Sequence, residues 1–92
     1  MTEVMIELAD ALLCLRTVSE IRRFLRDLCT PKEIYELERR WEICQLLQAG
    51  QLSYREIAEK LKTSVTTVTY VARFLRKEPN QGYATAFKRI RI

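Results

Sequence analysis

The sequence predicts an all-α fold of six helices, and three observations lead to this prediction. Only two glycines and two prolines occur in 92 residues, of which 48% are hydrophobic and 30% are charged, a mix typical of helix-rich globular proteins. Apolar residues recur at helical spacing along the chain. Helix-capping residues separate these apolar stretches. The length indicates a single domain over residues 1–92.

The first expected helix, Thr2–Leu15, is apolar over much of its circumference. A helix of this kind at the end of a small chain must be buried against more than one neighbour, which points to a partner subunit. Ser19 is expected to cap a second helix that ends near Leu28. Its apolar face is formed by Ile21, Phe24, Leu25 and Leu28.

Capping boxes mark the next two helices. Thr30 and Glu33 form the first box, with Pro31 at the first helical position, and a long helix should follow to about Ala49. Gly50 then ends that helix. Ser53 and Glu56 form the second box, which opens a short helix over residues 54–61.

Ser64 is expected to cap a helix from Val65 to about Arg76, and a last short helix is expected over residues 81–90. Residues 65–71 have high strand propensity, since they are all valine, threonine or tyrosine. The valines, however, recur every third residue, a spacing that a strand would not bury on one face. The segment is therefore interpreted as a helix.

Residues 53–76 have the pattern of a helix-turn-helix, in which the second helix enters the major groove of DNA. The small Ala58 suits a close helix crossing, and a shared core is expected from Ile57, Leu61, Val68 and Val71. The sequence departs from the usual helix-turn-helix in one respect, since the turn contains no glycine. One of the three residues 62–64 must therefore accept a strained or left-handed backbone.

The opposite face of the second motif helix has side chains suited to DNA. Threonine hydroxyls bond bases and phosphates, and threonine methyls pack on thymine. Ser64 and the backbone N–H groups that follow it can hold a phosphate. The residues expected to face DNA are Arg55, Ser64, Val65, Thr66, Thr67, Thr69, Tyr70 and Arg73, with Lys60, Lys62, Arg76 and Lys77 as further phosphate or guanine contacts.

The charge distribution agrees with this interpretation. Residues 1–59 hold 8 basic and 11 acidic residues, a net charge of −3, whereas residues 60–92 hold 8 basic and 1 acidic residue, a net charge of +7. The charge of the C-terminal part therefore predicts binding to an anionic partner. Double-stranded DNA is the first candidate, and an anionic membrane surface is the alternative. Alone, a basic amphipathic helix is often only a solvated surface.

Several other classes are disfavoured. The chain has no histidine, no paired Cys-x-x-Cys and an odd number of cysteines, so no metal site, cofactor or disulfide framework is expected. No apolar stretch is long enough to cross a membrane, and the acidic N-terminal region is unlike a signal peptide. We expect a cytoplasmic protein that is not an enzyme.

The segments 28–33, 46–57 and 64–69 resemble the tryptophan repressor superfamily, especially the Trp-repressor-like proteins of the YerC/YecD group. The resemblance covers about residues 10–90. It implies a six-helix fold in an intertwined homodimer, with the fourth and fifth helices as the DNA-reading part. It also assigns DNA contacts to Arg55, Val65, Thr66, Thr67 and Thr69.

The same resemblance locates a candidate effector pocket at Arg40, Tyr70 and Val71. In the tryptophan repressor the indole lies between two arginines, beside a glycine. Arg40 matches one arginine, but Tyr70 stands in place of the other and Val71 in place of the glycine. We therefore expect that free tryptophan is not the effector, and that either Tyr70 fills part of the pocket or a different small molecule binds.

The leading hypothesis is thus a dimeric, sequence-specific DNA-binding transcriptional regulator, expected to be a repressor. The alternative is a protein-interaction adaptor that reuses this fold without DNA. The two differ in whether a salt-dependent affinity for DNA exists.

Overall fold

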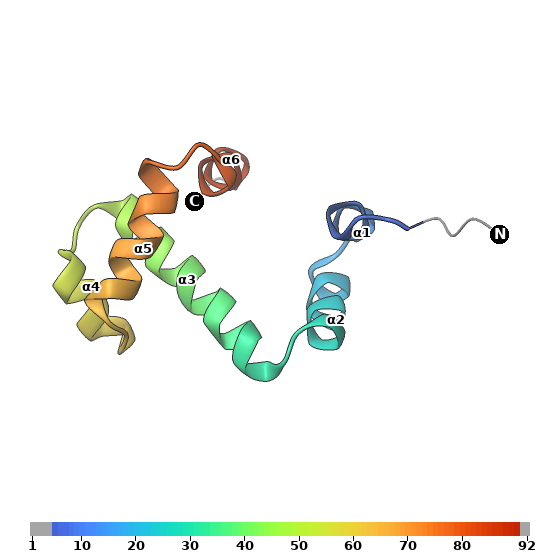
Figure 1. The fold of residues 1–92 in the computed structure, drawn as a ribbon, viewed down its shortest axis with the longest axis horizontal. Helices are drawn as coiled ribbons and strands as arrows, with labels where there is room; N and C mark the ends of the chain where they lie inside the picture. The colour runs from blue at the N-terminus through green and yellow to red at the C-terminus, as the bar shows by residue number, and fades with distance from the viewer. Residues whose placement is uncertain (1–4, 91–92) are drawn as a thin grey trace. The chain divides into compact units, whose positions relative to one another are not determined.

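The computed structural model describes residues 5–90, which form six α-helices and no β-strand (Figure 1). The helices are α1 (Leu8–Cys14), α2 (Val18–Leu28), α3 (Pro31–Ala49), α4 (Tyr54–Leu61), α5 (Val65–Arg76) and α6 (Gly82–Arg89). The predicted all-α fold is confirmed. The chain divides into two compact units, Met1–Tyr35 and Glu36–Ile92, and each is described by itself.

In the first unit the structure corrects two helix starts. The first helix begins at Leu8, not at Thr2, because Glu7 has an extended backbone; the expected residues 2–4 lie outside the described part. The second helix is capped by Thr17, not by Ser19: the Thr17 hydroxyl accepts a hydrogen bond from the Glu20 backbone N–H at 3.1 Å. The sequence Thr17-Val18-Ser19-Glu20 therefore provides a capping pattern two residues before the predicted one.

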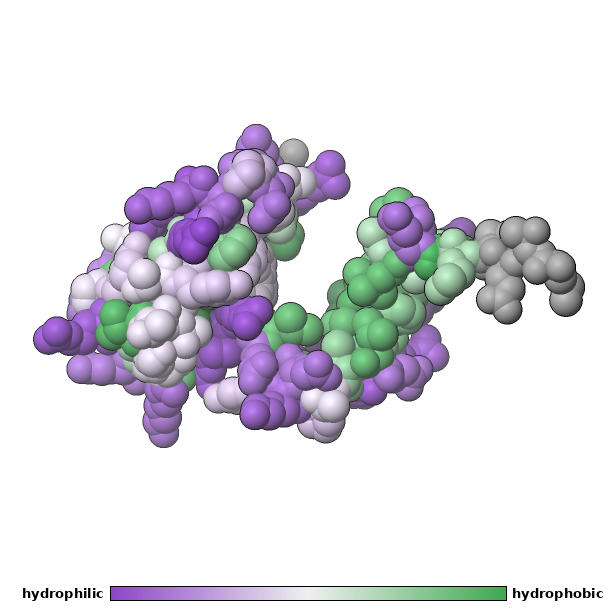
Figure 2. Space-filling view, in the orientation of Figure 1, coloured by the Kyte–Doolittle hydropathy of each residue, from purple (hydrophilic) through white to green (hydrophobic). Residues whose placement is uncertain are grey.

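The first unit has no buried side chain among its described residues. Figure 2 shows hydrophobic surface over α1 and α2. The large apolar side chains exposed there are Met5, Ile6, Leu8, Leu12, Leu13, Val18, Ile21 and Leu28. Leu13 remains 84% exposed and Val18 63% exposed. The apolar faces of these helices thus remain without a covering layer within this unit.

The long helix α3 begins and ends where the sequence predicts. The Thr30 N–H donates to the Glu33 carboxylate at 2.8 Å, and the Glu33 N–H donates to the Thr30 hydroxyl at 3.2 Å. Hydrogen bonding of the Glu33 carboxylate to the Thr30 backbone, and then to the Thr30 side chain, lowers the pKa of Glu33. Gly50 follows α3 with a left-handed φ of +70°, which glycine adopts at little cost.

The second unit contains the hydrophobic core. It is formed by Ile43, Cys44, Leu47, Ile57, Ala58, Leu61, Val68, Val71 and Ala72. The four residues predicted as the shared core of the helix-turn-helix are all buried, and Ala58 lies with them. Burial raises the pKa of the Cys44 thiol to about 11, so this cysteine is a neutral core residue at neutral pH.

Aromatic contacts join α6 to α3. The Trp41 ring stacks on Phe87 with centroids 5.1 Å apart and on Tyr83 with centroids 6.3 Å apart. The C-terminal helix is thereby held against the same long helix that supports the core.

Candidate nucleic-acid interface

The two helices α4 and α5 form the predicted helix-turn-helix. The capping box of α4 is complete: the Ser53 N–H donates to the Glu56 carboxylate at 2.9 Å, and the Glu56 N–H donates to the Ser53 hydroxyl at 3.1 Å. At the turn, Lys62 adopts the left-handed conformation, with φ 54° and ψ 47°. The strain predicted for the glycine-free turn is therefore located at a lysine.

Helix α5 is a helix despite its β-branched sequence, and it has two distinct faces. Val68, Val71 and Ala72 are buried against the core. Thr66, Thr69, Tyr70 and Arg73 are exposed on the other side, as predicted. Val65, 44% exposed, and Ser64 begin the same surface, whereas Thr67 is half-buried. The surface that the sequence assigns to DNA is thus accessible within this unit.

Hydrogen bonds orient several hydroxyl groups of this surface. The Ser64 hydroxyl caps α5 by accepting from the Thr67 N–H at 3.1 Å, and it also bonds the Thr67 hydroxyl at 2.9 Å. The Thr69 hydroxyl donates to the Val65 carbonyl at 2.9 Å. It therefore offers a ligand its acceptor lone pairs and its methyl group rather than its proton.

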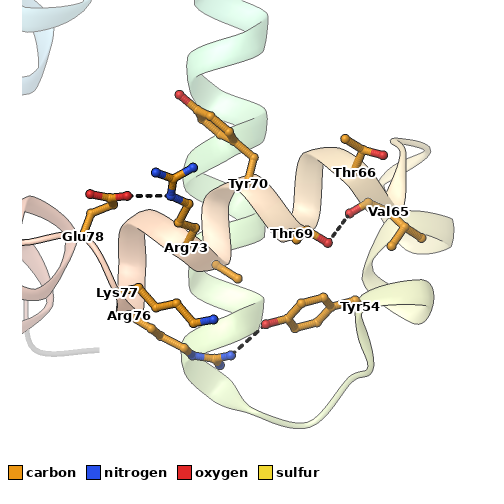
Figure 3. Close-up of a pocket in the computed structure, with 10 residues that line it drawn as sticks. Tyr54, Val65, Thr66, Thr69, Tyr70, Arg73, Arg76, Lys77 and Glu78 are labelled. Carbon is orange, nitrogen blue, oxygen red and sulfur yellow. Dashed lines mark hydrogen bonds and ion pairs between the residues drawn. The ribbon is translucent and has the colours of Figure 1, made fainter.

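Arg76, predicted as a further phosphate or guanine contact, also makes hydrogen bonds within the protein. One Nη donates to the Tyr54 hydroxyl at 3.1 Å and the other to the Leu47 carbonyl at 3.2 Å (Figure 3). These bonds tie the end of α5 to the start of α4 and to the last turn of α3. Arg76 therefore helps to hold the motif together, and the residue remains exposed.

Arg73 is paired as well, but on the exposed side. Its Nε donates to the Glu78 carboxylate at 2.5 Å, and its side chain remains 62% exposed. Figure 3 shows this pair beside Tyr70 and Thr69 along α5. Glu78 is the first acid after the basic run. The sequence indicates that Glu78, Pro79 and Asn80 end the helix, and it gives Glu78 no part in DNA binding.

Two hollows flank α5. One, of about 910 Å³, runs along its exposed face (Figure 3). It is lined by Val65, Thr66, Thr69, Tyr70, Arg73 and Lys77 with parts of Tyr54, Ala72, Arg76 and Glu78. The lining thus combines apolar side-chain surface with threonine hydroxyls and basic groups.

The second hollow, of about 320 Å³, brings together the three residues of the candidate effector pocket, Arg40, Tyr70 and Val71. The Arg40 guanidinium lies over the Tyr70 ring, 5.7 Å from its centroid, and the Phe74 ring lies 4.8 Å from Tyr70. The sequence reasoning missed the other lining residues, Phe74, Asn80, Gly82 and Tyr83. Phe74, one helical turn after Tyr70, could have been found from helical spacing.

The described residues, 5–90, lack two further features. None of their helices has the length and apolarity needed to cross a membrane. No group of three or more cysteine, aspartate or glutamate side chains in residues 5–90 is arranged to hold a metal ion.

The fold and the exposed face of α5 define an all-α protein with a helix-turn-helix. Comparison with known proteins then identifies its family. The Trp repressor protein family matches residues 3–91, and the chain belongs to this family. It is therefore a protein of a regulator family rather than of an enzyme family.

Two relatives support the assignment. The chain is 33% identical over 85 residues to the uncharacterized protein YerC of Bacillus subtilis (strain 168), an alignment that covers 92% of this chain and 80% of YerC. It is also similar to the crystal structure of a TrpR-like protein from Eubacterium eligens ATCC 27750. That similarity has a TM-score of 0.80 and 36% identity, and it covers 89% of this chain and 82% of the other. The resemblance seen in the sequence is confirmed.

Proposed function

We propose that this protein is a sequence-specific DNA-binding transcriptional regulator, a repressor that acts in the cytoplasm as a homodimer. The exposed face of α5 carries the proposal. It combines threonine hydroxyls with an arginine, and no acidic residue occurs from Lys60 to Lys77. Inserted into the major groove, such a face can bond base edges while the flanking lysines and Arg55 neutralise phosphates.

The dimer is proposed from the first unit. Its described residues bury no side chain, although α1 and α2 are rich in leucine, isoleucine and valine. A second copy of the chain would supply the missing cover and would join both units into one domain of 1–92. Two-fold symmetry would then place the two α5 helices about 34–36 Å apart, as two half-sites one turn of DNA apart require.

The assigned face is tested by two substitutions with different expected outcomes. Arg55→Ala should weaken binding to all DNA sequences alike and reduce the salt dependence by about one counterion, because a phosphate contact carries no sequence information. Thr67→Ala should instead alter base preference. Binding isotherms at several salt concentrations, on a selected operator and on random DNA, measure both effects. Unchanged binding in both variants would contradict the assignment.

We also propose that free tryptophan does not control this protein. Tyr70 fills the position where the tryptophan repressor has its second pocket arginine, and it lies under Arg40. Val71 adds side-chain volume where that repressor has a glycine. Either the Tyr70 ring itself holds the DNA-reading helix in place, or a different small molecule enters the 320 Å³ hollow.

The expected result of an isothermal titration with L-tryptophan is no binding in the micromolar range, since the pocket lacks a second guanidinium for the ligand carboxylate. DNA affinity should also be the same with and without tryptophan. Tight binding of tryptophan, or a tryptophan-dependent gain in DNA affinity, would overturn this part of the proposal.

The adaptor alternative makes a different prediction. A protein-interaction module that reuses this fold would show no affinity for DNA that falls with added salt. Selection of bound oligonucleotides from a random pool distinguishes the two functions, because only a DNA-reading protein enriches a common sequence.

A further inference from the structure

Glu78, two residues after the end of α5, lines the hollow along the exposed face of that helix and pairs there with Arg73. Glu78 is held there by the backbone as well: its N–H donates to the Arg73 carbonyl at 3.1 Å. The carboxylate is therefore fixed beside the arginine from the end of the same helix.

The geometry of the pair leaves one edge of the guanidinium available. Glu78 accepts from Nε, and the Phe74 ring lies 5.8 Å from the Arg73 Cζ. Within residues 5–90, the two terminal Nη groups have no recorded hydrogen-bond acceptor. Two parallel donors on a fixed plane match the O6 and N7 acceptors of guanine in the major groove.

The charge of the pair argues against a plain phosphate contact. A carboxylate at this position cancels the charge of Arg73 and repels phosphate, so it lowers the general affinity for DNA. A free arginine would bind phosphate better. A carboxylate that fixes the plane of the guanidinium, in contrast, favours a bidentate contact with a base over a mobile contact with the backbone.

We propose that Glu78 is a positioning residue that presents the Nη edge of Arg73 to a guanine in each half-site. This inference rests on the proposed function and adds a specificity residue to it. A bidentate arginine–guanine contact discriminates against other bases by roughly 10- to 100-fold.

The test begins with the wild-type chain and a pool of random oligonucleotides. A guanine preference that Arg73→Ala removes locates the position that Arg73 reads. At that position Glu78→Ala should reduce the preference for guanine by about 10-fold or more. The same variant should bind random DNA at least as tightly as the wild type, because the freed arginine can contact phosphate. The slope of log affinity against log salt concentration should be steeper by up to about one.

Glu78→Gln provides the conservative variant. Its amide oxygen can still accept from Nε, so the guanine preference should remain within about threefold of wild type while affinity for all DNA rises. Glu59→Ala removes an exposed carboxylate from α4 and serves as the matched control for charge, with no change in base preference expected. Helical circular dichroism and thermal unfolding check that each variant is folded.

Three results would overturn the proposal. In the first, Glu78→Ala keeps the full guanine preference. In the second, Arg73→Ala lowers only the salt slope and no base preference. In the third, Glu78→Ala weakens binding to specific and random DNA equally. Each of these leaves DNA binding itself intact, whereas a wild-type chain that binds no DNA would refute the proposed function as well.

Discussion

Leu13→Asp is expected to prevent dimer formation and to leave α1 and α2 poorly folded. Leu13 is 84% exposed within the chain, so in a monomer this substitution would change stability little. In the proposed dimer it would put an unpaired carboxylate into an apolar interface, which costs about 3–5 kcal/mol. Self-association should then weaken by at least about 100-fold. Sedimentation equilibrium would show one chain of 10.9 kDa in place of twice that mass.

Ser19→Asp is the control for this experiment. Ser19 is exposed in the first turn of α2, where an aspartate is favourable near the helix N-terminus, so the variant should remain dimeric. A Leu13→Asp protein that still sediments as a dimer with unchanged helix content would rule out this surface as the subunit interface.

Val68→Ala is expected to cost about 2 kcal/mol of unfolding free energy, because it removes two methyl groups from a side chain with no exposed surface and leaves a cavity. For a domain of this size that corresponds to a fall in Tm of roughly 10 °C. The helix-turn-helix would loosen, and DNA affinity should fall in parallel at temperatures near the new Tm.

The same helix supplies a matched control of the same residue type. Val65 is 44% exposed at the first position of α5, so Val65→Ala should change the free energy of unfolding by less than about 0.5 kcal/mol. Urea or thermal unfolding measures both variants. Equal losses at the two positions would contradict the division of α5 into a buried face and an exposed one.

Local signals explain why most of the fold could be predicted. The bounds of α3, α4 and α5 follow from three hydroxyl caps, Thr30, Ser53 and Ser64, and from Gly50. Each of these acts within four residues of itself, so it can be read from a short segment of sequence. The start of α2 was misplaced because two hydroxyl residues, Thr17 and Ser19, compete for the same role.

The hydrogen bonds that Arg73 and Arg76 make could not be predicted. The bond from Arg76 to the Leu47 carbonyl spans 29 residues, and its bond to Tyr54 spans 22 residues. Nothing in the spacing of the sequence distinguishes an arginine that makes such bonds from one that makes none. The bond from Arg73 to Glu78 spans only five residues, but it depends on how the chain leaves α5.

The left-handed turn at Lys62 has a consequence for evolution and for engineering. A lysine in this conformation costs on the order of 1 kcal/mol relative to glycine, yet it keeps a cation at the entrance to α5, close to the helix end that attracts anions. Lysine at this turn thus lowers the free energy of unfolding slightly, but it keeps a positive charge that glycine would not supply. We therefore expect that variants selected only for heat resistance would acquire glycine at this position. Such variants would lose one positive charge and with it part of their electrostatic affinity for negatively charged partners.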